Sequence, residues 1–321
     1  MAKGLRDAPA DGPRPASGPS SPGARRWVAI LKRTIREFRQ DNLTDWAAAL
    51  TYYGVMSLFP TLLVLVALLG LVGQYPQTSD AVLRIIDKIG PHSAVNTFRA
   101  PIQGVVRHKG GAGALLGVGL LGSLWSASGY VGAFMRASNA IYEVEEGRPF
   151  WKRRPLQVGL TLLVVVLLTA VSSAIVATGP LARAVGDEVG MGREAVTAFN
   201  IAKWPVIVLV LLAIVGLLYY VGPNVRQPRF PWITPGGVLA LVVWGAASAG
   251  LAFYAAKFGS FQKTYGTLGG AILFLVWMWV SNLALLLGNE LNAELERSRE
   301  LAAGLPAEAG IQLPPRAAPS R

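Results

Sequence analysis

Apolar runs long enough to cross a bilayer recur along most of the chain. The clearest is the 21-residue run from Leu268 to Gly288, interrupted only by Ser281 and Asn282. A hydrocarbon core about 30 Å thick is crossed by roughly 20 apolar residues of α-helix. The pattern predicts six such spans, at about 46–73, 113–136, 156–179, 200–221, 236–256 and 267–288. The predicted fold class is therefore all-α, a polytopic membrane bundle of six helices within residues 41–302.

The segments outside these spans differ in kind. Residues 1–24 and 303–321 are rich in proline with glycine or alanine and lack apolar periodicity, so both are expected to be disordered tails. Residues 25–40 place apolar side chains at helical spacing opposite basic ones, which predicts an amphipathic helix lying on an anionic membrane surface. The 74–112 connection predicts two short amphipathic helices that either roof an outward cavity or rest on the outer leaflet.

Composition and charge support the membrane class. The chain is 52% apolar and 15% charged, and its net charge of +12 comes mostly from residues that flank the spans. Because no compact basic domain with interleaved aromatics is present, nucleic-acid binding is not expected. The four segments on the side of the termini carry 19 Lys and Arg, against 9 in the other three loops. The positive-inside rule then places both termini in the cytoplasm.

No cofactor or metal site is expected. The chain has no cysteine, so disulfides and thiolate ligands are excluded. The string of glycines at 117–122 matches a dinucleotide fingerprint, but it lies inside a span with no strand before it, and close helix packing is the better interpretation.

The second span carries the sharpest functional pattern. One helical face changes from small to charged toward the cytoplasmic end, through Trp125, Gly129, Gly132, Arg136, Asn139 and Glu143. Arg136 either snorkels to the interface or sits inside the bundle and needs a carboxylate partner, because an unpaired charge in a span is costly. Asp45 and Glu290 reach the same depth by topology. We therefore expect Arg136 within salt-bridge reach of Asp45, Glu143 or Glu290, in a polar mouth that also includes Asn139, Asn289 and Asn292.

Three further side chains in span one and one in span six complete the candidate substrate or gating residues. They are Tyr52, Tyr53 and Pro60, and Asn282. Pro60 removes a backbone donor at mid-helix and so predicts a kink, either structural or part of a hinge.

Several stretches, taken in order, resemble the YihY/BrkB family of bacterial inner-membrane proteins, once labelled ribonuclease BN. They are AAALTYYGVMSLFP (47–60), LWSASGYVGAFMRASNAIYEVEE (124–146), YYVGPN (219–224), TPGGVLA (234–240), FYAAKF (253–258), YGTLGG (265–270) and LLGNELNAELE (286–296). The resemblance implies a six-helix bundle with cytoplasmic termini. The sequence departs from the family at Asn289, where a small residue is more common. A zinc nuclease needs clustered His and Asp ligands, and the only histidines are His92 and His108.

The leading hypothesis is a non-enzymatic membrane protein of envelope maintenance that moves or hands over a lipid or another amphipathic envelope molecule. Its expected partners are membrane lipids, with an envelope protein or a second copy of the chain as further partners. The first rival is a monovalent cation/proton antiporter, for which Asp45, Glu143 and Glu290 would be the exchange sites. The second rival is a scaffold that transports nothing.

Overall fold

The computed structural model describes residues 24–72, 113–176, 193–228, 233–257, 267–308 and 310–318. In these residues the secondary structure is helical apart from one isolated β-bridge. The helices are α1 (Ala24–Gln40), α2 (Leu43–Val72), α5 (Gly113–Ile141), α6 (Phe150–Val176), α8 (Arg193–Val221), α9 (Pro235–Lys257) and α11 (Thr267–Ala302). The all-α prediction is confirmed. The tail predicted for residues 1–23 and the amphipathic helices of the 74–112 loop lie outside the described residues.

Four of the six predicted membrane spans are confirmed as helices of sufficient length and hydrophobicity. Within the described residues, four segments have the length and composition to cross a membrane: Phe150–Ala174, Ile201–Val221, Pro235–Ala255 and Gly269–Ala302. Helices α2 and α5 have 30 and 29 residues, so at 1.5 Å per residue each is also long enough. Their assignment as spans stays a prediction.

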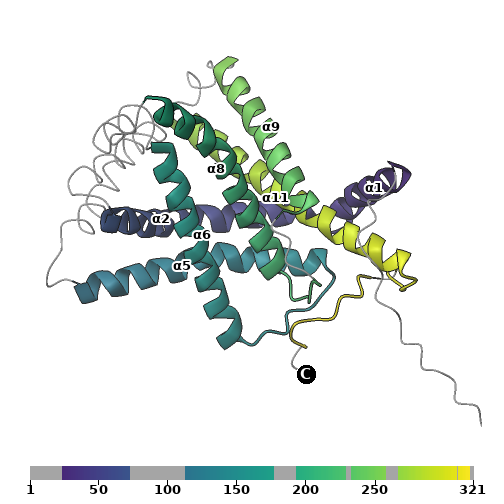
Figure 1. Cartoon of the computed structure of the whole chain (residues 1–321). Helices are drawn as coiled ribbons and strands as arrows, with labels where there is room; N and C mark the ends of the chain where they lie inside the picture. The colour runs from purple at the N-terminus through teal and green to yellow at the C-terminus, as the bar shows by residue number, and fades with distance from the viewer. Residues whose placement is uncertain are drawn as a thin grey trace, which may run out of the picture.

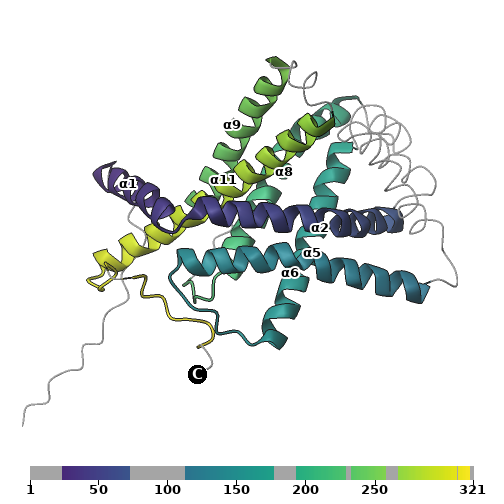
Figure 2. The ribbon, with the colours of Figure 1, turned by 180° about the vertical axis from the view of Figure 1, so that it is seen from behind.

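Helix α11 is the element around which the others assemble. It packs against α9, α2, α5 and α1, and α2 in turn lies beside α5 along much of its length (Figures 1 and 2). The main core lies where α2, α5, α8 and α11 meet, and Leu50, Phe134, Tyr219 and Leu286 are buried in it. The rings of Phe134 and Tyr219 stack with centroids 6.3 Å apart, so α5 and α8 are joined at the centre of the bundle.

Two glycines allow α9 and α11 to cross at close range. A Cβ atom at Gly288 would collide with the backbone oxygen of Gly236, and one at Gly236 would collide with the backbone oxygen of Gly288. The hydroxyl of Tyr219 also lies beside Gly288 and donates a hydrogen bond to the carbonyl of Leu285, 2.6 Å away. Small residues permit this backbone approach, which is the usual basis of tight helix pairs in membranes.

Helix α1 forms as predicted, and one of its sides packs on α11. Ile30 is buried against Leu291 and Leu295. Three other apolar side chains of α1, Val28, Leu31 and Ile35, are exposed. These exposed side chains are available to a membrane surface, so the interfacial placement of α1 stays a prediction.

The prediction of a disordered tail at 303–321 is wrong for residues 310–318. Pro315 pairs with Val225 in the isolated bridge, and the backbone N–H of Arg316 donates to the carbonyl of Asn224, 2.9 Å away. The guanidinium of Arg316 donates to the carbonyls of Val225 and Tyr220, each at 2.8 Å. Composition suggested disorder because the segment has no apolar pattern, but its order comes from hydrogen bonds to the loop that follows α8.

Candidate functional site

The predicted polar mouth divides into two regions. The first, here called the polar joint, consists of residues 288–300 of α11 and the side chains that contact them. The second, here called the arginine pocket, is a cavity of about 470 Å³ between α2, α5 and α6. It is lined by Tyr53, Trp125, Gly129, Gly132, Met135, Arg136, Glu146, Phe150, Arg153, Arg154 and Gln157.

In the joint, the predicted asparagines hold helices together. The amide of Asn289 donates to the hydroxyl of Ser138 on α5, 3.0 Å away. Asn292 donates to the hydroxyl of Thr234 at 3.1 Å and accepts from the backbone N–H of Gly236 at 3.0 Å. Asn292 therefore satisfies a donor at the start of α9, where four N–H groups lack partners within the helix.

The charged groups of the joint form a chain of ion pairs between α1, α5 and α11. Glu294 is buried between Arg33, at 3.5 Å, and Arg297, at 3.0 Å. Arg297 also donates to Glu143, with 2.7 Å between the two atoms. The candidate carboxylate Glu143 is thus already paired. Glu290 differs, because its side chain is buried and one of its carboxyl oxygens has no hydrogen-bond partner.

A second buried network joins the loop after α5 to the end of α8. Asn139 donates to Glu146 at 3.0 Å and accepts from the backbone N–H of Asn224 at 2.7 Å. Arg148 donates to Glu146 at 2.7 and 2.8 Å and to the carbonyls of Val221 and Gly222 at 3.1 and 2.9 Å. Burial alone would raise the pKa of Glu146, but its hydrogen bonds with Arg148 and Asn139 and the charge of Arg148 outweigh burial, so that the pKa is lowered.

The predicted salt bridge of Arg136 is wrong. Arg136 forms no ion pair with any part of the chain that the structure describes; it is exposed, and its guanidinium carbon lies 5.2 Å from the centre of the Tyr53 ring. The prediction assumed that the helix continues to Glu143. Helix α5 ends at Ile141, and Glu143 has a left-handed φ of 52°, which turns its side chain toward Arg297.

Two more arginines and two aromatic rings share the pocket with Arg136. The guanidinium carbon of Arg154 lies 4.0 Å from the centre of the Trp125 ring, and Arg154 donates to the backbone carbonyl of Trp125 at 2.8 Å. Arg153 forms no ion pair with the described residues. Trp125 and Phe150 are each about half exposed, at 50% and 52%. The pocket therefore combines cationic groups with exposed aromatic surface.

The lining of the arginine pocket includes one carboxylate, Glu146, which Arg148 already holds. Gly132 leaves room for α6, since a Cβ there would lie 3.0 Å from the amide nitrogen of Gln157. Gly129, Gly132 and Arg136 thus share one face, as the sequence indicated, and this face lines a cavity. Arg153 and Arg154 were counted from sequence only as topology charges. Their position directly after the aromatic pair at 150–151 was the signal that could have identified them.

The remaining candidates lie apart from both regions or tie helices together. Asn282 donates to Thr51 at 3.1 Å and accepts from the hydroxyl of Tyr130 at 2.8 Å, so it joins α2, α5 and α11. Asp45 is exposed near the start of α2, and Tyr52 is exposed with its ring edge on Tyr53. Pro60 lies inside the single helix α2, and the predicted kink stays a prediction.

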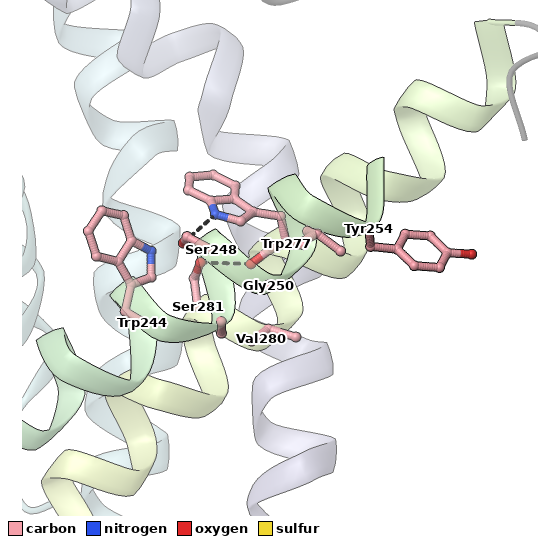
Figure 3. A pocket seen from close by; sticks show the side chains of 9 residues that line it. Trp244, Ser248, Gly250, Tyr254, Trp277, Val280 and Ser281 are labelled. Carbon is pink, nitrogen blue, oxygen red and sulfur yellow. Dashed lines mark hydrogen bonds between the residues drawn. The ribbon is translucent and has the colours of Figure 1, made fainter. Parts of the chain in front are cut away.

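A smaller cavity of about 180 Å³ lies between α9 and α11 (Figure 3). The indole N–H of Trp277 donates to Ser248 at 3.0 Å, and Ser281 donates to the carbonyl of Trp277 at 2.7 Å. Figure 3 shows the ring of Tyr254 directed away from the two tryptophans that line the cavity. The lining contains no charged side chain. This cavity resembles a packing gap more than a site for a polar ligand.

Comparison with known proteins places these features in a family. The sequence model described as virulence factor BrkB matches residues 34–310. The ribonuclease-like protein YfkH of Bacillus subtilis is 31% identical over 274 residues, which cover 85% of this chain and 98% of the relative. A UPF0761 membrane protein of Vibrio campbellii is 26% identical over 84% of this chain and 82% of its own length.

A UPF0761 membrane protein of Methylibium petroleiphilum is 27% identical over 82% of this chain, but the match covers 61% of that longer relative. No solved structure matches the chain. The family match spans most of the sequence, including both the polar joint and the arginine pocket. The chain therefore belongs to the BrkB family of membrane proteins.

Proposed function

We propose that this protein binds a phosphate-bearing lipid of the cell envelope in the arginine pocket and hands it on as part of envelope maintenance. The observation that carries the proposal is the charge of the pocket. Arg136, Arg153 and Arg154 line it, and none of them forms an ion pair with the described residues. The single lining carboxylate, Glu146, is neutralised by Arg148.

The chemistry of the pocket fits a phosphate headgroup. Guanidinium groups present a planar fork of donors that matches phosphate oxygens in pairs, which a headgroup without phosphate or carboxylate could not use. Because three such cations line the pocket, a headgroup with net negative charge fits better than a zwitterionic one. A cavity of about 470 Å³ lies within the range of small-ligand sites. The rings of Trp125 and Phe150 supply apolar surface next to the charges, as needed by a ligand whose polar head is attached to acyl chains.

The place of the pocket along the helices also fits a lipid. Arg136 lies near the end of α5, and Phe150 begins α6, so the cations lie close to the loop that joins these helices. Exposed Phe150 and Trp151 are typical of the level of the headgroups. On the charge asymmetry we propose that this level belongs to the cytoplasmic leaflet of the inner membrane, with both termini in the cytoplasm.

A nuclease activity is not part of the proposal. The relative YfkH is named ribonuclease-like, but the two histidines of the present chain, His92 and His108, are too few for a clustered zinc centre. Within the described residues no group of three potential metal ligands was found. The cation/proton antiporter is the second candidate, and the one observation that favours it is the unpaired carboxyl group of Glu290.

Lipid movement in proteoliposomes tests the proposal. Labelled phosphatidylglycerol and labelled phosphatidylcholine would be compared by a quenching assay that reports exchange between leaflets. We expect the wild type to accelerate exchange of the anionic lipid, and Arg136→Ala to abolish most of the acceleration. Arg299→Ala is the matched control, because Arg299 is an exposed arginine of α11 that pairs only with Glu296 in the described structure. Equal rates for the wild type and Arg136→Ala would contradict the proposal.

A further inference from the structure

Glu290 is a buried carboxyl group of the polar joint that forms no ion pair with the described residues. Its side chain is 2% exposed, and its Oε2 atom has no hydrogen-bond partner within the described residues. The other buried side chains of the joint described above, Asn289, Asn292, Glu294 and Arg297, each have a hydrogen-bond or ion-pair partner outside α11. A buried carboxylate that is ionised but unpaired is among the most destabilising arrangements in a protein.

The charged and titratable groups that face Glu290 come from every element packed around it. Asp41 of the α1–α2 turn, Glu37 of α1, and Glu294 and Arg297 of α11 interact electrostatically with Glu290, as does Tyr142 just after α5. Arg33 and Arg36 of α1 act on Glu294, and Glu143 pairs with Arg297. Three of the charges that act on Glu290, those of Asp41, Glu294 and Glu37, are acidic, and Arg297 acts in the opposite direction. Like charges at short range disfavour ionisation of each member of the group.

The cations of the joint are already engaged. Arg297 donates to Glu143 and contacts Glu294, while Arg33 also lies beside Glu294. Arg36 pairs with Glu37 at 2.9 Å. Each of these three guanidinium groups is thus held by another carboxylate, and none forms an ion pair with Glu290 in the described structure. The neutral, protonated acid is the form that suits this environment.

We propose that Glu290 is a proton-binding site, occupied in the present conformation, and that proton uptake at this carboxyl holds the α1–α2 turn against α11. The inference goes beyond the lipid pocket and does not depend on it. Loss of the proton would add one more negative charge beside Asp41 and Glu37. The repulsion is relieved most directly by separation of the turn from α11.

The pKa of Asp41 indicates that the α1–α2 turn lies in the same acidic surroundings as Glu290. Asp41 lies in the turn between α1 and α2, outside the membrane-spanning segments. Burial, together with the charges of Glu37 and Glu143, raises the pKa of Asp41 to about 6, although Arg297 acts in the opposite direction. The turn and α11 therefore share an acidic interface that favours bound protons.

Infrared spectroscopy of the purified full chain tests the proposal directly. We expect the wild type at neutral pH to show the carbonyl band of a protonated carboxyl group, and Glu290→Gln to lack it. The control is Glu296→Gln, since Glu296 is paired with exposed Arg299, and this variant should keep the band. A wild type without the band, or a Glu290→Gln variant that retains it, would overturn the proposal.

A second readout separates a proton from a metal cation. The thermal midpoint of the wild type should fall as the pH rises from the acidic range, where the unfolded chain also keeps the proton, to the pH at which the folded protein releases it. Glu290→Gln should lose this part of the dependence while remaining folded, because the amide mimics the neutral acid. Stabilisation of the wild type by sodium or potassium ions that Glu290→Gln abolishes, with no acid band, would show a cation site and overturn proton binding.

Discussion

The polar joint and the arginine pocket contain the same residue types, but they use them in opposite ways. In the joint, Glu294 and Arg297 of α11 neutralise each other and also pair with Arg33 of α1 and with Glu143 just after α5. In the pocket, Arg136 and Arg153 have no carboxylate partner in the described structure. Polar groups that are satisfied within the chain hold helices together, whereas unsatisfied cations that face a cavity are available to a ligand. Mutations in the two regions should therefore affect different measurements.

The largest effect is expected at the glycine crossing that anchors the joint. Gly288→Val would force side-chain atoms into the backbone of Gly236 and the hydroxyl of Tyr219. The backbone of Gly236 cannot move aside without separating α9 from α11. We expect little folded protein in the membrane fraction, measured by fluorescence-detected size exclusion. Gly245→Val in α9 is the control, since a Cβ there meets nothing within 4 Å. Normal yield of Gly288→Val would show that the crossing is less tight than described.

The second largest effect is expected from a mutation of Arg148. Arg148→Ala removes a buried cation and leaves the partly buried Glu146 with Asn139 as its remaining side-chain partner. Breaking a buried ion pair typically costs about 3–5 kcal/mol, so we expect a loss toward the lower end of this range. The thermal midpoint in detergent should therefore fall by many degrees. The exposed pair of Arg299 and Glu296 offers the comparison, because Arg299→Ala should change stability by less than about 1 kcal/mol. Similar losses of thermal stability in the two variants would show that the buried ion pair contributes no more to stability than the exposed one.

Arg136 should affect binding and leave stability unchanged. A charge-assisted hydrogen bond is worth about 1.5–3 kcal/mol, so Arg136→Ala should weaken binding of an anionic phospholipid roughly 10- to 100-fold. Arg136→Lys should be impaired nearly as much, because it retains charge but loses the planar fork. Retention of lipid measured by native mass spectrometry would report binding. A fall in the thermal midpoint without a change in lipid retention would instead show that Arg136 stabilises the fold and does not bind the lipid.

The smallest effect concerns pH and Asp41. The pKa of Asp41 is raised from 3.8 to about 6, so the unfolded chain releases this proton more readily than the folded one. The contribution of Asp41 to stability is therefore lost as the pH rises from about 4 to 6 and then stays level. Asp41→Asn should be more stable than the wild type above pH 6, and the advantage should disappear below pH 4. Parallel pH profiles of the two proteins would contradict this account.

Much of the fold could be predicted because hydrophobic runs and charge asymmetry act locally. The positions of α6, α8, α9 and α11 along the chain and the basic helix α1 followed from hydrophobic runs and periodicity, although α11 continues to Ala302, beyond the predicted end at residue 288. The order of residues 310–318 could not be predicted, since it depends on hydrogen bonds to Asn224 and Val225, which are far away in sequence.

The candidate site could be predicted only where its residues lie on one continuous helix. Helical spacing correctly grouped Gly129, Gly132 and Arg136 on one face. The same spacing failed for Glu143, because the left-handed residue after α5 breaks the register and redirects the carboxylate to Arg297. Which charges remain unpaired is decided by packing between helices, and a single sequence does not specify that packing.

The most direct test of the central claim is photo-crosslinking with a phosphatidylglycerol that carries a diazirine in its headgroup, followed by peptide mapping. The account predicts crosslinks at 125–136 of α5 and 150–157 of α6, and their loss in Arg136→Ala but not in Arg299→Ala. Crosslinks spread evenly over the exposed surfaces of α8 and α9, and unchanged in Arg136→Ala, would contradict the account.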